Sequence, residues 1–265
     1  MNVHSVSIKG LRDQNEDKHD IILNSDNRNC ELKNVNFFGV YDGHGGKEVS
    51  NYIQNNISNY FLNKQVNYPL SKRFVLNVYD HIEVALKKYD WAYYSGTTCI
   101  IVVHFKFNGS NYLNVVNLGD SRCVLCRDNF AMPLSKDHKP NWPEERHRIE
   151  QLGGKIVYDG YDWRIKDLSV SRSFGDLEAT PFVSNRPDLY RYKLDKNDKF
   201  FVIACDGLWD VMSNSEVVNY ILLNCYDDTT NNRTNKTMNI AKKLAEYALK
   251  KGSTDNITII VVFLN

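Results

Sequence analysis

Four aspartates of the chain stand where an apolar run of residues meets a turn, and their side chains are well placed to do chemistry. Asp42, Asp120 and Asp206 each follow such a run, and Asp255 comes just before one. In an antiparallel sheet these strand ends can lie at one edge. A carboxylate at the end of a buried strand is costly unless it is paired or binds a cation. A cation site is therefore one interpretation of the pattern.

Carboxylates and backbone carbonyls are hard oxygen donors, which suit Mg²⁺ or Mn²⁺ and not zinc. Two such ions can bridge a water, lower its pKa and hold phosphate oxygens during an in-line displacement. The alternative is that each aspartate serves as a turn or helix-capping residue. Each stands beside a glycine or an asparagine and next to a predicted strand, which weakens the alternative. The spacing alone leaves both interpretations open.

The turn that begins at Asp42 contains further residues that could take part in a reaction. Residues 42–46 read DGHGG, and a helical pattern follows over 47–61. Glycine lets the backbone come close to something small. His44 in this turn can transfer protons near neutral pH, and a plain turn residue is the alternative.

The elements that must position these residues can be predicted from periodicity and turn residues. We expect strands over 4–9, 21–23, 37–41, 97–107, 112–118, 123–127, 200–205 and 257–263. We expect helices over 47–61, 71–89 and 142–152, with two more around 217–222 and 240–248. Segments 24–36 and 227–235 are polar and are predicted to be loops. Hairpins together with paired helices predict an α+β fold of antiparallel sheets with helices packed outside them. No repeat or linker divides the chain, so residues 1–265 are expected to form a single domain.

Composition narrows the classes of partner. The 265 residues carry a formal net charge of +1, which gives no electrostatic reason to expect nucleic acid or an anionic membrane as a partner. The N-terminus does not resemble a signal peptide, and no apolar run approaches the ~20 residues that span a bilayer. We expect a monomer located in the cytoplasm, with the nucleus as the alternative.

Six cysteines over this length do not make a disulfide scaffold. The one close pair, Cys123 and Cys126, lies in a predicted strand, where residues three apart point to opposite faces. We therefore interpret both as buried structural residues. A redox or zinc site is the alternative, and no second cysteine or histidine pair supports it.

Eight segments follow one another in an order that resembles a known family. They are RDQNED at 12–17, DGHGG at 42–46, SGTT at 95–98, NLGDSR at 117–122, DHKP at 137–140, LSVSRSFGD at 168–176, DGLWD at 206–210 and TDNIT at 254–258. Together they resemble the metal-dependent protein phosphatase family, known as protein phosphatase 2C or PPM-type serine/threonine phosphatases. The resemblance covers almost the whole chain. It implies a central sandwich of two antiparallel β-sheets flanked by antiparallel helices on both outer faces.

The resemblance also implies a binuclear Mg²⁺ or Mn²⁺ centre that activates a bridging water for direct attack on phosphoserine or phosphothreonine. Asp42 would bridge the two ions, and the Gly43 carbonyl would bind one of them. Asp206 and Asp255 would bind the other. The expected partners are phosphoprotein substrates.

Further roles come from the same resemblance. Glu16 would hold a water beside the metals, and Asp120 and Asp210 would join Asp206 at a weaker third metal position. Arg12 would hold the substrate phosphate, a use to which a planar bidentate donor is suited. His44 would be the general acid that protonates the leaving alkoxide.

Other residues of the segments are assigned to structure. We interpret Asp17 as a support for the metal ligands, and Trp209 as a core residue. Thr97, Thr98 and residues 171–176 are expected to hold strands and turns near the site. The compact segment 154–168 takes the place of the family's flap over the cleft, and it is expected to shape substrate preference.

The rival hypothesis is a catalytically inactive pseudophosphatase that acts as a binding module. Such a protein is expected to have lost one or more of the metal-binding aspartates. Asp42, Asp206 and Asp255 are all present here, together with Arg12 and His44, which favours the enzyme.

Overall fold

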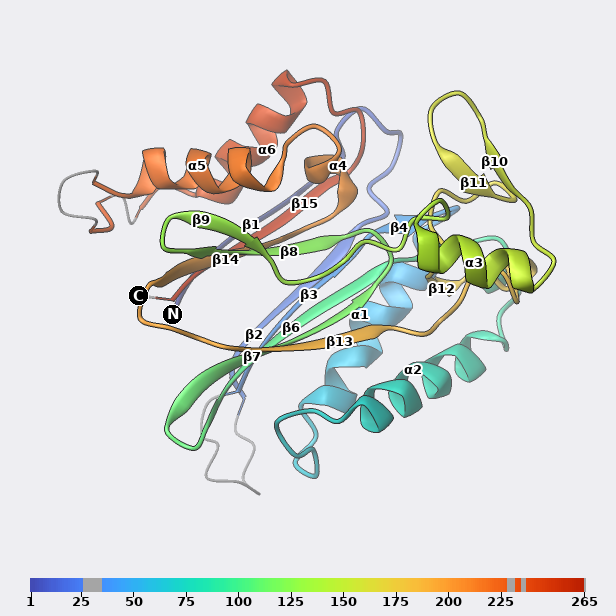
Figure 1. The fold of residues 1–265 in the computed structure, drawn as a ribbon, viewed down its shortest axis with the longest axis horizontal. Coiled ribbons are helices and arrows are strands. Elements are labelled where there is room, and N and C mark those ends of the chain that lie inside the picture. The colour runs from blue at the N-terminus through green and yellow to red at the C-terminus, as the bar shows by residue number, and fades with distance from the viewer. Residues whose placement is uncertain (26–34, 228–231, 235–236, 265) are drawn as a thin grey trace.

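The computed structural model describes residues 1–25, 35–227, 232–234 and 237–264 (Figure 1). Two five-stranded antiparallel sheets form its centre. The first has the order β1 (Asn2–Ile8), β15 (Ile257–Phe263), β14 (Asp198–Ala204), β8 (Arg122–Arg127) and β9 (Phe130–Pro133). The second has the order β13 (Asp188–Lys193), β7 (Ser110–Leu118), β6 (Cys99–Phe107), β3 (Val35–Tyr41) and β2 (Lys18–Ser25).

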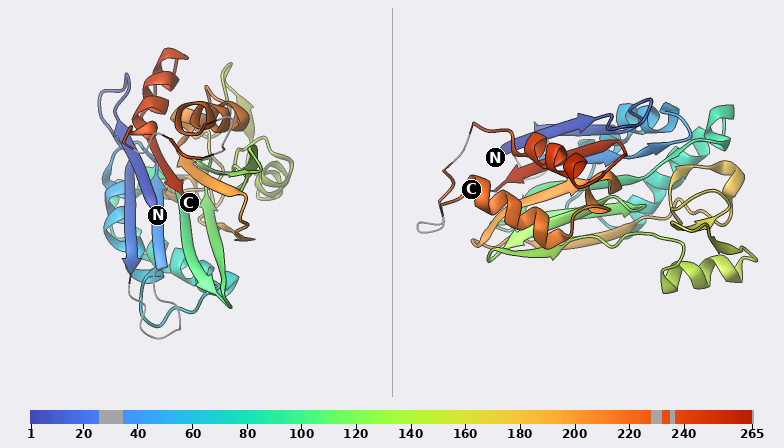
Figure 2. Two further views of the ribbon diagram at one scale, coloured as in Figure 1. Left: turned by 90° about the vertical axis from the view of Figure 1, so that its left-hand side faces the viewer. Right: turned by 90° about the horizontal axis from the view of Figure 1, so that it is seen from above.

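Helices cover the outer faces of both sheets (Figures 1 and 2). The helices α1 (Glu48–Phe61) and α2 (Lys72–Leu86) share a hydrophobic core with β3 and β6 of the second sheet. The helices α5 (Asn214–Cys225) and α6 (Ile240–Lys250) share another with β14 and β15 of the first sheet. The predicted sandwich of two antiparallel sheets between helix layers is confirmed.

Apolar residues on both faces of the central strands explain this layering. Every residue of β3, β14 and β15 is buried. Because side chains alternate along a strand, Phe37 faces the helices α1 and α2, whereas Phe38 faces the other sheet. Between the sheets, Phe38 meets Phe201 edge to face, with ring centroids 5.5 Å apart. The central strands are therefore packed on one face against helices and on the other face against the opposite sheet.

Smaller elements complete the fold at one end of the sandwich. They are the three-stranded sheet of β12 (Phe174–Gly175), β5 (Gly96–Thr97) and β4 (Gly43–His44), the hairpin of β10 (Ile156–Tyr158) and β11 (Trp163–Ile165), the helices α3 (Pro143–Gln151) and α4 (Asp206–Trp209), and the 3₁₀ helices η1 (Asp90–Tyr93) and η2 (Leu177–Ala179). The hairpin β10–β11 lies within the segment predicted to be a flap. None of the helices in the described part of the chain is long and apolar enough to cross a membrane.

Several predicted elements have other bounds in the structure; the strand predicted over 21–23, for example, covers Lys18–Ser25. The helix predicted over 71–89 has its cap at Ser71 but ends at Leu86, because the chain turns so that Tyr89 stacks on Trp91. The strand predicted over 97–107 is split at Thr98, whose N–H donates to the Asp42 carbonyl at 2.9 Å. The predicted loop 24–36 lies mostly outside the described residues, and the loop 227–235 lies partly outside them.

The close cysteine pair behaves as a pair of core residues. Cys123 packs between the two sheets, and Cys126 packs in the layer beneath α5 and α6. Both are free thiols. The prediction that they point to opposite faces is confirmed.

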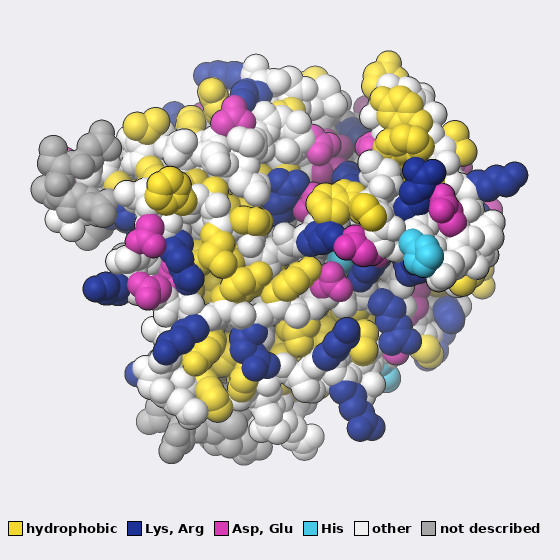
Figure 3. Space-filling view, in the orientation of Figure 1, with side chains coloured by type: hydrophobic (Ala, Val, Ile, Leu, Met, Phe, Trp, Pro, Cys, Tyr) yellow, Lys and Arg dark blue, Asp and Glu magenta, His cyan; other side chains and the backbone are white. Residues whose placement is uncertain are grey.

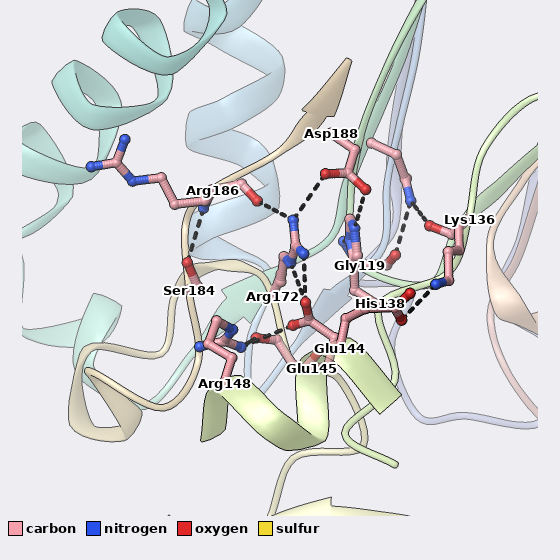
Figure 4. A network of polar contacts seen from close by, with 12 residues as sticks. Gly119, Lys136, His138, Glu144, Glu145, Arg148, Arg172, Ser184, Arg186 and Asp188 are labelled. Carbon is pink, nitrogen blue, oxygen red and sulfur yellow. Dashed lines mark hydrogen bonds and ion pairs between the residues drawn. The ribbon is translucent and has the colours of Figure 1, made fainter. Parts of the chain in front are cut away.

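A network of ion pairs attaches α3 to the sandwich (Figure 4). The buried carboxylate of Glu145 accepts from Arg172 Nη2 at 2.5 Å and from Arg148 Nη2 at 2.9 Å. Arg172 Nη1 also donates to Asp188 Oδ1 at 3.2 Å. Asp188 Oδ2 lies 3.2 Å from His138 Nε2. The network therefore ties α3 to β13.

The network continues from β13 to the turn that carries one of the four aspartates. His138 Nδ1 accepts from the backbone N–H of Gly119 at 3.0 Å. Gly119 comes directly before Asp120. This turn is therefore linked to α3 through side chains from three separate segments.

We predict that the Glu145 network makes folding sensitive to acid. Burial alone would raise the Glu145 pKa, but Arg172 and Arg148 outweigh burial and lower that pKa to about 2. Because the pKa is lower in the folded state, the ionised carboxylate stabilises the fold. This stabilisation is fully present above pH 4.5, the ordinary pKa of the group, and is lost as the pH falls toward 2. Glu145→Gln should lower the free energy of unfolding by about 3 kcal/mol at neutral pH. It should also flatten the pH dependence between these values, measured by urea denaturation.

Glu150→Gln on the same helix is the matched control, because Glu150 forms only an exposed pair with Arg146. It should change the free energy of unfolding by less than about 0.5 kcal/mol. Equal effects of the two substitutions would contradict the assignment.

Candidate functional site

Three aspartates from distant parts of the chain meet at one end of the sandwich. Asp42 follows β3, Asp120 follows β7, and Asp206 begins α4 directly after β14. Each offers one carboxylate oxygen, and these three oxygens lie within 4.8 Å of one another. Figure 3 shows acidic side chains on this face next to the β10–β11 hairpin. Of the four aspartates that the sequence suggested could meet at one edge, these three form a close group, and Asp255 does not belong to it.

The backbone around Asp42 is fixed by two neighbouring threonines. Thr97 Oγ1 donates to the Asp42 carbonyl at 3.0 Å. The Asp42 N–H donates to Thr98 Oγ1 at 3.3 Å. Thr98 Oγ1 also contacts Ser121 Oγ at 2.8 Å, in the turn that carries Asp120. Thr97 and Thr98 therefore hold the turns of the site, as predicted.

The carboxylates of the site repel one another. Burial, followed by the charges of Asp206, Asp17 and Asp120, raises the pKa of Asp42 well above its ordinary range. Burial, followed by the charges of Asp120 and Asp210, does the same to the pKa of Asp206. A bound cation would relieve both effects, since it favours the charged form of each carboxylate.

Asp17 gives a separate indication that the site suits a cation. Its side chain is buried, with 2% exposure, yet neither carboxylate oxygen has a hydrogen-bond partner. One of these oxygens lies within 4.8 Å of ligand atoms of Asp42 and Cys205. Burial raises the Asp17 pKa to about 6. An unpaired buried carboxylate beside Asp42 fits a site built for divalent cations.

Gly43 and Glu16 pack against each other. A Cβ atom on Gly43 would lie 2.5 Å from the Glu16 carbonyl oxygen and 2.8 Å from Ser50 Oγ, so only glycine fits here. The Glu16 N–H donates to Asn256 Oδ1 at 2.8 Å. The backbone of Glu16 thus joins the turn after β3 to the segment before β15. Metal binding by the Gly43 carbonyl, and the role of the Glu16 carboxylate, stay predictions.

Lys139 enters the site, which the sequence did not lead us to expect. Its ammonium group forms an ion pair with the buried carboxylate of Asp120. Burial lowers the pKa of Lys139, but the charges of Asp120 and Asp206 outweigh burial and raise it. Asp120 was predicted to bind a weaker third metal, and in this structure the chain itself supplies a cation to it.

Asp210 lies at the rim of this group. It is exposed and follows the last residue of α4. Burial and the charge of Asp120 raise its pKa, whereas the charge of Lys139 lowers it. Its assignment to a third metal position stays a prediction.

Asp255 and Arg12 pair with each other at the edge of the site. Arg12 Nη2 donates to Asp255 Oδ2 at 2.6 Å, and the two side chains are 60% and 37% exposed. The Asp255 charge still raises the pKa of both Asp42 and Asp206. Asp255 therefore belongs to the electrostatic neighbourhood of the site, although it is not one of the three carboxylates in the close group.

His44 lies on β4 and contacts an aspartate to which we gave only a structural role. Its Nε2 lies 2.8 Å from Asp176 Oδ2. Burial would lower the His44 pKa, but the Asp176 carboxylate outweighs burial and raises it. The segment 168–176 was recognised in the sequence, yet nothing in it indicates which side chain points toward His44.

Trp209 is a core residue, as predicted. It is buried, and its indole N–H donates to the Ala204 carbonyl at 2.9 Å. The Arg122 guanidinium lies 5.2 Å from its ring centroid and binds Asp137 through two nitrogens. Trp209 thus supports the start of α4 from inside.

Solved structures share this fold. A phosphatase from a pathogenic strain of Toxoplasma gondii aligns with a TM-score of 0.81 over 98% of this chain and 92% of that one, at 23% identity. A sex-determining protein of C. elegans aligns with a TM-score of 0.84 over 100% of this chain and 65% of that one, also at 23% identity. At this identity the likeness concerns the fold alone.

Sequence relatives carry the assignment further. A PP2C-like domain-containing protein of Acanthamoeba polyphaga mimivirus is 45% identical over 58% of this chain and 94% of its own length. The mouse integrin-linked kinase-associated serine/threonine phosphatase 2C is 35% identical over 96% of this chain and 70% of its own. A probable protein phosphatase 2C of Arabidopsis thaliana is 34% identical over 86% of this chain, which spans about half (48%) of that relative.

The family model described as protein phosphatase 2C matches residues 1–257, a range that contains all the site residues described above. The chain therefore belongs to the protein phosphatase 2C family and is a serine/threonine phosphatase.

Proposed function

We propose that the chain hydrolyses phosphoserine and phosphothreonine in proteins by a one-step displacement at phosphorus that depends on two Mg²⁺ or Mn²⁺ ions. The observation that carries the proposal is the meeting of Asp42, Asp120 and Asp206 within 4.8 Å at the ends of buried strands. The unpaired carboxylate of Asp17 beside them supports it. The coarser assignment to a serine/threonine phosphatase rests on the family alone.

The residues present fit divalent ions. The ligands would be Asp42, the Gly43 carbonyl, Asp206 and Asp255, with Glu16 beside them and with Asp120 and Asp210 at a third position. When bound, the ions would lower the pKa of a water and hold phosphate oxygens. All of these donors are oxygens, which suits Mg²⁺ or Mn²⁺ better than a softer metal.

Arg12 would bind the substrate phosphate. Its guanidinium is exposed at the edge of the carboxylate group and holds Asp255 through Nη2. Planar guanidinium groups bind phosphate through two parallel hydrogen bonds. A phosphate arriving at the site would therefore compete with Asp255 for Arg12. A metal ion would compete with Arg12 for Asp255.

His44 would protonate the leaving oxygen. Its side chain is 29% exposed, so solvent and substrate can reach it. A serine or threonine alkoxide is a poor leaving group and benefits from a proton donor.

The rival hypothesis of an inactive binding module is not supported, because the chain retains Arg12, His44 and the aspartates proposed to bind metal.

The proposal extends to the setting of the reaction. The substrates would be phosphoproteins, the working form a monomer and the location the cytoplasm.

The direct test is hydrolysis of a phosphothreonine peptide by the purified chain. We expect phosphate release with Mn²⁺ or Mg²⁺, loss of release with excess EDTA, and recovery when the metal is added back. Protein that is folded but inactive with both metals from neutral to alkaline pH would contradict the proposed function.

Asp206→Asn and His44→Ala should separate metal binding from proton transfer. Asp206→Asn removes a ligand, so calorimetric Mn²⁺ binding and phosphatase activity should be lost together. His44→Ala should bind Mn²⁺ as the unaltered chain does, while kcat on the peptide falls about 10²- to 10⁴-fold. Loss of Mn²⁺ binding in His44→Ala, or its retention in Asp206→Asn, would contradict these roles.

Arg12→Ala should weaken substrate binding without weakening metal binding. Losing a charge-assisted hydrogen bond to phosphate costs about 1.5–3 kcal/mol, so kcat/KM should fall about 10- to 100-fold, mainly through KM. Mn²⁺ affinity should stay equal or rise, because Asp255 loses its competing partner. Arg12→Lys keeps the positive charge but loses the planar pair of N–H donors. It should therefore recover only part of the lost kcat/KM. Weaker Mn²⁺ binding in Arg12→Ala would show that Arg12 supports the metal site instead.

A further inference from the structure

We propose that Asp176 is a positioning residue for His44: it holds the imidazole through Nε2 and thereby makes Nδ1 the nitrogen that gives a proton to the leaving serine or threonine oxygen. The inference rests on the proposed function, and it gives Asp176 a role beyond the structural one expected from the sequence.

The contact between the two side chains engages one of the two nitrogens of the imidazole. His44 Nε2 lies 2.8 Å from Asp176 Oδ2. Asp176 is 3% exposed and His44 is 29% exposed, so the aspartate lies on the inner side of the ring. An imidazole has only two nitrogens. With Nε2 bound to Asp176, substrate chemistry is left to Nδ1.

The small sheet β12-β5-β4 brings the two residues together. His44 on β4 pairs with Gly96 on β5, and Gly175 on β12 pairs with the same Gly96 from the other side. Asp176 follows Gly175 directly, so His44 and Asp176 meet across the central strand. The sheet therefore sets their distance through backbone pairing.

Gly96 leaves the room that this contact needs. A Cβ atom on Gly96 would lie 2.1 Å from Asp176 Oδ2 and 2.6 Å from His44 Nε2. Real Cβ atoms do not approach other atoms so closely. The hydrogen bond passes over the glycine, and any other residue there would push the two side chains apart.

Asp176 is itself held in place. Its N–H donates to the Ser95 carbonyl at 3.0 Å, and Ser173 Oγ donates to its Oδ2. Its backbone has φ 49° and ψ 38°, in the left-handed region that few non-glycine residues adopt. A residue kept in that region by its surroundings is often part of a functional site.

The proton step balances as follows. The bond between phosphorus and the serine or threonine oxygen breaks, and that oxygen takes the proton from Nδ1 of the charged His44. The attacking water loses one proton to solvent and brings its oxygen and its other proton to the phosphate. His44 then takes a proton from solvent, which restores its charged form. Throughout, the Nε2 proton stays with His44 and donates to Asp176.

The test compares two substrates with different leaving groups. A phosphothreonine peptide needs a proton on its leaving oxygen, whereas p-nitrophenyl phosphate releases a stable phenolate. Asp176→Asn keeps the volume but removes the charge that orients His44. We expect kcat on the peptide to fall about 10- to 100-fold with KM changed less than about 3-fold. We expect kcat on p-nitrophenyl phosphate to fall less than about 3-fold.

Asp198→Asn is the matched control for the loss of a buried carboxylate. Asp198 is buried and pairs with Arg127 at the start of β14, whereas Asp206 follows the end of that strand. This variant should keep both activities within about 2-fold, and both variants should bind Mn²⁺ as the unaltered chain does. Equal loss on both substrates in Asp176→Asn, or no loss on the peptide, would overturn the inference.

A second measurement needs no variant. Nitrogen-15 NMR of the unaltered chain, at a pH where His44 is neutral, should show the proton on Nε2. A neutral His44 with its proton on Nδ1 would also overturn the inference. The proposed function fails separately, if the unaltered chain hydrolyses neither substrate with metal present.

Discussion

Repulsion among carboxylates that the fold holds together is the constraint on which the active site depends. Asp42 and Asp206 are partly buried near each other, and burial and mutual charge raise the pKa of both. Asp17 adds a buried carboxylate without a hydrogen-bond partner. The chain offsets part of this repulsion with Lys139 and Arg12. Divalent ions are the partners that would offset the rest.

Such a site requires a frame that does not let the carboxylates move apart. The central strands provide it, because they are buried on both faces and the side chains of Phe38 and Phe201 interlock between the sheets. Thr97 and Thr98 fix the turn of Asp42 through hydrogen bonds. The ion-pair network around Glu145 extends to the backbone N–H of Gly119, the residue before Asp120. The packing of the whole sandwich therefore offsets the free-energy cost of holding these like charges close together.

Much of this arrangement could be predicted from the sequence, because strands that are apolar throughout and end at Asp-Gly are a local signal. The sandwich and the meeting of Asp42, Asp120 and Asp206 followed from it and from the family resemblance. Local patterns could not supply the contacts made by Lys139 and Asp176. Asp176 lies 132 positions from His44, and their contact depends on a glycine in a third strand. Side-chain direction at such a junction is set by tertiary packing and leaves no periodic pattern.

We propose that the folded chain binds divalent ions at this group of carboxylates. Ion binding to the folded state alone stabilises it, by about 2.7 kcal/mol when the free ion is at 100 times its Kd. The most direct measurement is the urea unfolding midpoint as a function of Mn²⁺ concentration, for the unaltered chain and for Asp206→Asn. We expect a midpoint that rises with Mn²⁺ in the unaltered chain and stays constant in the variant. A midpoint that does not respond to Mn²⁺ in the unaltered chain, or that rises equally in both, would contradict it.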